Sequence, residues 1–419
     1  MPDRRPNRLP LLVAGGLGLA LAAATPTARA ADPPPRAPAS PVAPDRPPSG
    51  AAFLERAWPG HPEWLAMLAD IVVVGDRLGG ADGWFRKGVA QSRFGWDATR
   101  REFDRDGDGA VTPAEFAGRP ADFARLDRDR DGALGAPDFD FSPPPPIPGM
   151  GLFARADRDG NGKITRDEFD LVFRALDDGG LGFLSRGDVQ RLFAPPPAAA
   201  AGPASAPPGG GGGGGGPSRG TLLKSFLRRE LGAFPAGPAL DEPAPDFTLP
   251  TVDGDEITLS KLVGPKPVVL VFGNFTCGPF RALAGDLEKL HRRYADRATF
   301  VMVYVREAHP TDGWRMDGND RMGVSFPQPR TDAERRSIAQ VCNRAMGLGF
   351  PMAIDTMDDA VNTRYSGIPS RFYLVDRAGR VAFKSGRGPF GFRPAELEQS
   401  LLLLLRHDDR EPTASRPGP

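Results

Sequence analysis

One cysteine and two polar residues in the C-terminal half of the chain are placed to carry out thiol chemistry. Cys277 follows the apolar run 267–273 across a sharp turn, and a helical pattern of leucines begins after it. At the start of a helix, free backbone N–H groups and the helix dipole favour the thiolate. A second apolar run, 299–305, leads to Glu307 and His309. Because the carboxyl ends of neighbouring parallel strands share one crevice, we expect this acid and this imidazole to meet the thiol there.

The same residues also have purely structural interpretations. The alternatives are an inert, buried role for Cys277 and a hydrogen bond from His309 to Asp312 at the strand end. Phe280 stands where a C-x-x-C motif would place its second cysteine, so the helix start carries one thiol. The other cysteine, Cys342, shares a helical stripe with apolar residues: Ile338, Val341, Ala345 and Met346. This pattern favours a packed core thiol over a resolving partner for Cys277.

A second group of residues has the spacing of a cation-binding loop. The pattern D-x-[DN]-x-[DN]-G with an acid at position 12 surrounds a hard cation with oxygens within one tight turn. Residues 104–115 and 157–168 fill every ligand position, and residues 127–138 end in a shorter acid. We therefore expect two to three Ca²⁺ sites and no organic cofactor. The expected ligands, with position 7 contributing its backbone carbonyl, are Asp104, Asp106, Asp108, Ala110, Thr112, Glu115, Asp127, Asp129, Asp131, Ala133, Asp138, Asp157, Asp159, Asn161, Lys163, Thr165 and Glu168.

A fourth repeat, 177–188, is degenerate. Gly179 and Leu181 stand where ligands belong, so we expect this loop not to bind calcium. Position 8 is apolar in all four loops, which lets two loops pair through a short backbone ladder: Val111, Leu134, Ile164 and Leu184. The fourth loop is therefore expected to be a structural partner of the third.

These repeats resemble the EF-hand family over about residues 101–192. Apolar residues at helical spacing precede the loops, which favours EF-hands over dockerin repeats, because dockerin repeats lack the entering helix. In an exported protein the calcium concentration is nearly constant, so an ion that stabilises the fold is favoured over a sensor switch.

The composition excludes several classes of protein. The 419 residues carry 53 Lys+Arg and 53 Asp+Glu, a balance that argues against a nucleic-acid partner because no basic excess is available for phosphates. The 40% hydrophobic content is enough for more than one core. Two cysteines allow at most one intrachain disulfide, so no disulfide framework holds the fold.

Low-complexity stretches divide the chain. Residues 1–30 have a basic start, an apolar stretch and a small-residue ending, which predicts a signal peptide; the alternative is an uncleaved membrane anchor. We expect an exported protein, periplasmic or secreted, without stable membrane insertion. The remaining segments are expected to be a Pro-rich linker (31–50), a helical calcium-binding module (51–193), an Ala/Pro/Gly linker (194–220), an α/β module (221–408) and a disordered tail (409–419).

A third strand is expected at 370–375, introduced by Gly367-Ile368-Pro369. A proline in this place, beside a thiol at a helix start, resembles the cis-proline of thioredoxin folds. On these residues the segment from about 243 to 405 resembles the thioredoxin superfamily. The expected fold class is therefore multidomain, with an all-α EF-hand module followed by an α/β thioredoxin-like module.

Within that superfamily, the motifs resemble the iodothyronine deiodinase family. They are Phe272-Gly273 with Thr276-Cys277, Glu307-Ala308-His309 with Asp312-Gly313-Trp314, Asp355-Thr356-Met357, Pro369-Ser370-Arg371 and Gly388-Pro389. The resemblance implies reductive dehalogenation, a thiol electron donor and a halogenated aromatic or other small-molecule substrate. It also implies roles for particular residues: Cys277 in the place of selenocysteine, Glu307 and His309 in substrate contact and proton handling, Arg371 as an anchor for a substrate carboxylate, and Asn274, Thr276, Trp314 and Pro369 around the pocket.

Two departures from the family pattern leave other functions open. Sulfur replaces selenium, and no histidine lies between His309 and His407, where the family has a second substrate-binding histidine. The alternatives are a thiol peroxidase or general thiol–disulfide oxidoreductase on the same fold, and a non-catalytic, calcium-dependent binding or scaffold protein.

Overall fold

The computed structural model describes residues 54, 57–58, 62–73, 90–141, 149–177, 180, 182–185, 218–232, 234–388 and 391–410. These residues all fall within one compact unit, 48–419. The predicted signal peptide, the Pro-rich linker and most of the second linker lie outside the described residues, so they stay predictions. Helix α10 begins at Arg219 and α17 ends at Arg410, each two residues from a boundary expected from the sequence.

A six-stranded mixed sheet in the order β1-β8-β7-β4-β5-β6 forms the centre of the fold. The strands are β1 (Gln91–Ser92), β4 (Val268–Gly273), β5 (Thr299–Tyr304), β6 (Met352–Ile354), β7 (Arg371–Val375) and β8 (Val381–Lys384). Strands β4, β5 and β6 run parallel, whereas β7 and β8 are antiparallel to their neighbours. Every residue of β4 is buried, as an unbroken apolar run predicts. The three strands expected from the sequence are therefore confirmed.

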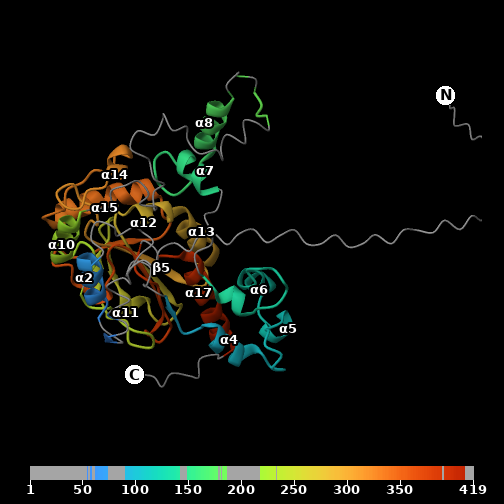
Figure 1. Cartoon of the computed structure of the whole chain (residues 1–419). Helices are drawn as coiled ribbons and strands as arrows, with labels where there is room; N and C mark the ends of the chain where they lie inside the picture. The colour runs from blue at the N-terminus through green and yellow to red at the C-terminus, as the bar shows by residue number, and fades with distance from the viewer. Residues whose placement is uncertain are drawn as a thin grey trace, which may run out of the picture. The chain divides into compact units, whose positions relative to one another are not determined.

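Helices cover both faces of this sheet. One face packs against α12, α13, α15 and α17, and the other against α11, α16 and the hairpin of β2 and β3. The bounds are β2 (Thr248–Pro250), β3 (Glu256–Thr258), α10 (Arg219–Leu227), α11 (Leu259–Leu262), α12 (Gly278–Ala282), α13 (Ala284–Tyr294), α14 (Asp317–Arg321), α15 (Asp332–Met346), α16 (Ala360–Tyr365) and α17 (Pro394–Arg410). The Ile368–Pro369 peptide bond is cis. This arrangement confirms the α/β thioredoxin-like fold (Figure 1).

The segment before these elements is helical, as expected, with one addition. Its elements are α2 (Glu63–Val73), α4 (Trp96–Phe103), α5 (Pro113–Phe116), α6 (Pro120–Leu126), the 3₁₀ helix Ala136–Phe139, α7 (Gly149–Ala156) and α8 (Arg166–Leu176). The addition is strand β1, which pairs antiparallel with the outer edge of β8. The other edge of the sheet carries an isolated bridge from Thr251 to Ala353 of β6.

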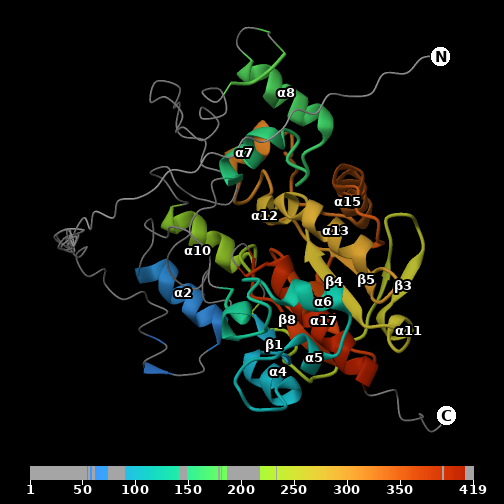
Figure 2. The same cartoon turned by 90° about the vertical axis from the view of Figure 1, so that its right-hand side faces the viewer.

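Helix α17 joins the two segments into a continuous core. Its five consecutive leucines, 401–405, are all buried, which requires apolar neighbours on every side of the helix. Strands β7 and β8 and helix α13 contact α17, and α6 lies beside it in both Figures 1 and 2. Gln399 also donates from Nε2 to the carbonyl of Asp138 at 3.0 Å.

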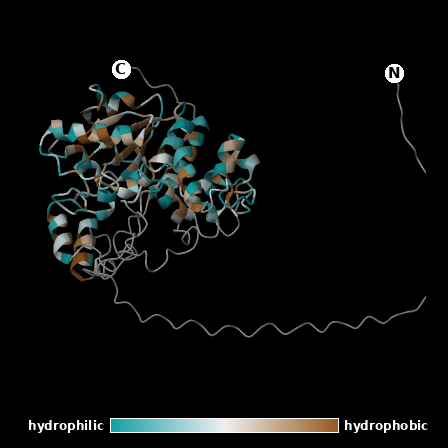
Figure 3. Ribbon diagram, turned by 90° about the horizontal axis from the view of Figure 1, so that it is seen from above, coloured by the Kyte–Doolittle hydropathy of each residue, from teal (hydrophilic) through white to brown (hydrophobic). Residues whose placement is uncertain are grey.

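The surface helices carry hydrophilic and hydrophobic residues together (Figure 3), as amphipathic helices that cover a core do. Within the described ranges, no helix combines the length and the apolar character that crossing a bilayer requires.

Truncating a leucine of α17 is expected to destabilise the whole unit. Leu403 is fully buried, so Leu403→Ala should lower the free energy of unfolding by about 2–5 kcal/mol through lost apolar burial and a cavity. Leu227→Ala is the matched control, because Leu227 is 75% exposed and should change stability by less than about 0.5 kcal/mol. Denaturant unfolding followed by circular dichroism measures both. Equal effects of the two substitutions would contradict this packing.

Candidate active site and calcium loops

The thiol of Cys277 is located at the start of a helix, as the sequence predicts. Cys277 is the N-cap residue of α12, and its backbone follows the carboxyl end of β4. Its Sγ lies 4.0 Å from the hydroxyl of Ser370, the residue after cis-Pro369. The side chain is 1% exposed, so the thiol is sealed from solvent in this conformation.

Burial changes the expected ionisation of this thiol. Loss of solvent raises the pKa of Cys277, and three weaker effects lower it: the N–H of Phe280, the Ser370 hydroxyl and the charge of Arg281. The helix start therefore acts in the expected direction, but desolvation outweighs it. The expectation of a thiolate is wrong for this conformation, because the sequence pattern placed the helix correctly without revealing what covers the sulfur.

Glu307 holds the turn that precedes Cys277. Its Oε2 accepts hydrogen bonds from the backbone N–H of Thr276 at 2.9 Å and from the Thr276 hydroxyl at 2.7 Å. Its Oε1 accepts from the hydroxyl of Tyr304. Glu307 is fully buried, and burial raises its pKa, while the hydrogen bonds from Tyr304 and Thr276 act against that rise. Glu307 therefore acts as a positioning residue for the turn 274–277, here called the thiol turn.

Asn274 ties three segments of the site together. Its Nδ2 donates to the carbonyl of Pro369 at 3.0 Å, and its Oδ1 accepts from the backbone N–H of Ala308 at 3.1 Å and lies 3.1 Å from the Thr276 hydroxyl oxygen. Asn274 and Thr276 were predicted to lie around the pocket. Both are fully buried, and their hydrogen bonds hold the segments around Cys277 together.

His309 is bound to the same turn through its backbone and to Trp314 through its ring. Its N–H donates to the Thr276 hydroxyl at 3.0 Å, and its Nδ1 lies 3.1 Å from the carbonyl of Trp314. The two rings meet edge to face, with centroids 4.7 Å apart. Burial lowers the pKa of His309 to about 4, so the imidazole is neutral at pH 7. The alternative bond to Asp312 is wrong, because Asp312 accepts from the N–H of Gln328 instead.

Arg371, the predicted anchor for a substrate carboxylate, has its charged partner outside the group of residues around Cys277. Its Nη1 donates to the carbonyl of Ala236 at 3.1 Å, and its Nη2 lies 3.8 Å from Oε2 of Glu63. Its side chain is only 3% exposed. The structure thus brings Asn274, Thr276, Cys277, Glu307, His309 and Pro369 together and places Arg371 beside an acid from the N-terminal helix α2.

A buried cation near the thiol was missed from the sequence. Arg281 donates to the carbonyl of Phe275 and, at 2.7 Å, to Oδ1 of Asn319, whose amide in turn donates to the carbonyl of Thr276 at 2.8 Å. The available signal was its spacing, four residues after Cys277 and hence on the same side of a helix. Cys342 is fully buried in α15, which agrees with a core thiol, and both cysteines are free.

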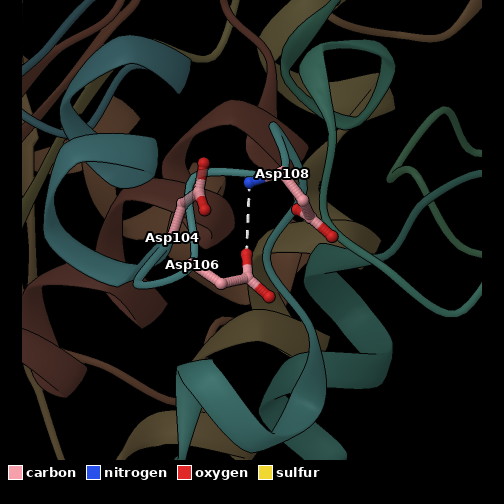
Figure 4. A group of neighbouring side chains, drawn as sticks. All are labelled: Asp104, Asp106 and Asp108. Atoms are coloured by element: carbon pink, nitrogen blue, oxygen red, sulfur yellow. Dashed lines mark hydrogen bonds between the residues drawn. The ribbon is translucent and has the colours of Figure 1, made fainter.

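The calcium loops have the geometry that their spacing predicts. In these three loops and in the degenerate fourth, the residue at position 6 donates its N–H to the aspartate at position 1, at 3.1, 3.1, 3.0 and 2.8 Å along the chain. Gly109 has φ +90°, a conformation that glycine adopts without strain. Asp104, Asp106 and Asp108 lie close together in the first loop (Figure 4), where the N–H of Asp108 donates to Asp106 at 3.1 Å.

Three groups of acids fit a hard cation. Each group offers carboxylate oxygens that lie within 4.8 Å of one another: Asp104, Asp106 and Asp108; Asp127, Asp129 and Asp131; Asp157, Asp159 and Glu168. An all-oxygen donor set is the one that Ca²⁺ prefers. Glu115 and Asp138, the expected ligands at position 12, accept the backbone N–H groups of Arg105 at 3.0 Å and Arg128 at 2.6 Å.

The first two loops pair as expected. Val111 and Leu134 form an antiparallel bridge, with N···O distances of 3.0 and 2.9 Å. No such bridge joins Ile164 to Leu184 in the described part of the chain, and much of the fourth loop lies outside it. The pairing of the third loop with the fourth therefore stays a prediction.

Comparisons with known proteins match the calcium loops and the thioredoxin-like region to two different families. Residues 223–403 match the family model described as iodothyronine deiodinase, and residues 101–117 and 151–173 match the EF-hand model, which indicates calcium binding. The second loop lies between the two EF-hand matches.

Curated relatives match the same C-terminal region. Thyroxine 5-deiodinase of Gallus gallus is 33% identical over 157 residues, which is 37% of this chain and 59% of that protein. The human thyroxine 5-deiodinase is 31% identical over 170 residues, 40% of this chain and 53% of that protein. The chain thus spans less than two thirds of the length of these relatives.

Solved structures are similar to a comparable share of this chain. A secreted disulfide oxidoreductase of Mycobacterium tuberculosis is 21% identical, with a TM-score of 0.28, and covers 38% of this chain and 96% of its own. A thiol:disulfide interchange protein from a Bacteroides species is 17% identical, with a TM-score of 0.29, and covers 40% and 90%.

Alkylation of Cys277 should be slow at neutral pH and should rise steeply with pH. Because burial raises the pKa of the thiol, the thiolate fraction should still be increasing above pH 8.5, about the pKa of a free thiol. Iodoacetamide alkylation of the Cys342→Ser variant, followed by mass spectrometry, measures this profile without the second thiol. A rate that levels off below pH 8 would contradict the burial effect.

Loss of a position 1 aspartate should remove one calcium site. Calcium should raise the melting temperature of the calcium-free protein, because it binds the folded loops. Asp104→Asn should reduce this rise, since it weakens an all-oxygen site at the first loop. Asp177→Asn in the degenerate loop is the matched control and should match the wild type. A rise that Asp104→Asn leaves unchanged would argue against calcium at the first loop.

Proposed function

We propose that this chain, an iodothyronine deiodinase-like thioredoxin-fold protein with EF-hand repeats before that fold, is an exported, calcium-binding oxidoreductase. In this proposal Cys277 takes the place of selenocysteine and performs thiol-dependent reductive dehalogenation. The substrate class is a halogenated aromatic, and the electrons come from a small or protein thiol. Calcium occupies the first three loops and stabilises the fold.

One observation carries the proposal. Glu307 and His309, which follow one strand, both bond to Thr276, the neighbour of Cys277 at the end of the adjacent strand. Cys277, the Glu307 carboxyl group and the backbone of His309 are thereby held at the carboxyl ends of β4 and β5. A ligand that reached the thiol there would also meet the Ser370 hydroxyl.

The reaction balances with two equivalents of thiol. The Cys277 thiolate attacks iodine, the carbon–iodine electron pair passes to the carbon, and a proton converts that carbon to C–H. The sulfenyl iodide then reacts with one donor thiol to release iodide and a proton and to form a mixed disulfide. A second donor thiol restores Cys277 and leaves the donor disulfide. His309 is neutral, and both oxygens of Glu307 accept hydrogen bonds that hold the turn before Cys277, so the proton that the carbon takes up is the one that Cys277 gives up on ionisation.

The sealed thiol has two consequences for this function. Substrate reaches Cys277 only when the covering side chains move, and the thiol ionises more readily once solvent enters. The same burial favours the alternative of a non-catalytic calcium-dependent binding protein, because a protonated, enclosed thiol is unreactive.

Iodide release separates these functions. With 2,6-diiodophenol and a dithiol donor, the wild type should release iodide, and Cys277→Ser should lower the rate by roughly 100-fold or more because the nucleophile is lost. Cys342→Ser is the matched control and should retain activity, since Cys342 belongs to the core. Peroxide consumption that depends on Cys277, without iodide release, would instead support a thiol peroxidase. If the protein shows neither iodide release nor peroxide consumption, the non-catalytic alternative is supported.

A further inference from the structure

Three basic side chains are buried around one carboxylate. Arg371 of β7, Lys384 of β8 and Arg387 after β8 are 2%, 7% and 3% exposed. Arg387 donates from Nε and Nη2 to the two carboxylate oxygens of Glu63, at 2.9 and 3.2 Å. Nη2 of Arg371 lies 3.8 Å from the same carboxylate.

This cation cluster, Arg371, Lys384 and Arg387, carries three positive charges against two nearby carboxylates, the half-buried Glu63 and the exposed Glu242 beside Lys384. Burial raises the pKa of Glu63, but Arg387 and Arg371 more than reverse that effect and lower it to about 2. Burial and then repulsion by Arg371 lower the pKa of Lys384 to about 8. Nε of Arg371 has no hydrogen-bond partner among the described residues. Buried cations that outnumber their counter-charges are costly, so the cluster is suited to bind a further or a better-placed anion.

Glu63 reaches the cluster from a pair of packed helices, α2 and α10, that are far apart in the chain. It is the first residue of α2, which packs on α10 through an apolar cluster that includes Met67, Ile71 and Phe226 (Figure 2). Trp314 packs against the same apolar cluster and also contacts the ring of His309. The α2–α10 pair therefore contacts both the cation cluster and Trp314, which packs on His309.

Arg387 connects the cation cluster to the loop before cis-Pro369. Its Nη1 donates to the carbonyl of Ile368 at 3.2 Å, and its Nη2 to the hydroxyl of Ser366 at 2.8 Å. A carboxylate bound by Arg387 would thus lie on the chain segment that leads to Ser370, the partner of the Cys277 thiol.

We propose that Arg371, Lys384 and Arg387 form a site for a carboxylate and that Glu63 is its internal occupant, so that α2 competes with a carboxylate-bearing ligand. A tethered carboxylate has a high effective concentration, so an external carboxylate must displace it to bind. Displacement of Glu63 loosens α2 and uncovers Trp314 and His309. This inference rests on the proposed function only for the identity of the ligand, an aromatic carboxylate.

Binding of two matched probes to the full-length protein tests the competition. The probes are 3,5-diiodo-4-hydroxybenzoate and its carboxylate-free analogue 2,6-diiodophenol, titrated by calorimetry without a thiol donor. Glu63→Gln should tighten binding of the benzoate about tenfold or more and leave the phenol within about twofold, because only the benzoate competes with Glu63. Glu256→Gln, which removes an exposed carboxylate on β3, is the matched control and should change neither.

Benzoate binding that Glu63→Gln leaves unchanged or weakens would overturn the inference. A second measurement on the wild type covers the case in which the variant does not fold. Saturating benzoate should speed amide hydrogen exchange in residues 63–73, whereas the phenol should not, and equal exchange with both probes would also overturn it. Because neither measurement uses thiol turnover, absence of iodide release would refute the proposed function alone.

Discussion

The carboxylate of Glu307 holds the turn on which the thiol site depends. It accepts both the N–H and the hydroxyl of Thr276, and so joins the carboxyl ends of β4 and β5 through one buried side chain. That pair of bonds holds Thr276, the residue directly before Cys277, the N-cap of α12. Asn274 extends the same network to the loop containing Pro369, and Ser370 of that loop contacts the thiol itself. A site assembled in this way is rigid, which suits preorganisation of a reacting group.

Local patterns in the sequence predicted much of this arrangement. The unbroken apolar run 267–273 predicted a strand buried on both faces, and the parallel pairing of β4 and β5 brings Glu307 to the thiol turn as expected. The calcium loops followed from spacing alone, since each ligand position is set within twelve residues. Such features depend on neighbours in the chain, and for this reason they can be read from one sequence.

The features that were not predicted depend on residues far apart in the chain. Glu63 lies 324 residues before Arg387, and no local pattern indicates that they form an ion pair. The burial that raises the pKa of Cys277 likewise comes from packing between elements, not from its own helix. A run of five leucines in α17 did carry a signal, because a helix apolar on all sides needs a partner on each side. That partner is the N-terminal segment, whose core continues into that of the sheet.

Strand β1 has a consequence for the solution behaviour of the protein. An open strand at the border of a sheet offers unpaired N–H and C=O groups that recruit strands from other molecules. Here Gln91 and Ser92 occupy the border at β8, and Thr251 occupies part of the opposite border at β6. Gln91 and Ser92 of the calcium-binding segment thus block the pairing of β8 with a strand of another molecule. A proteolytic cut that released these residues would expose the edge of β8 and favour aggregation.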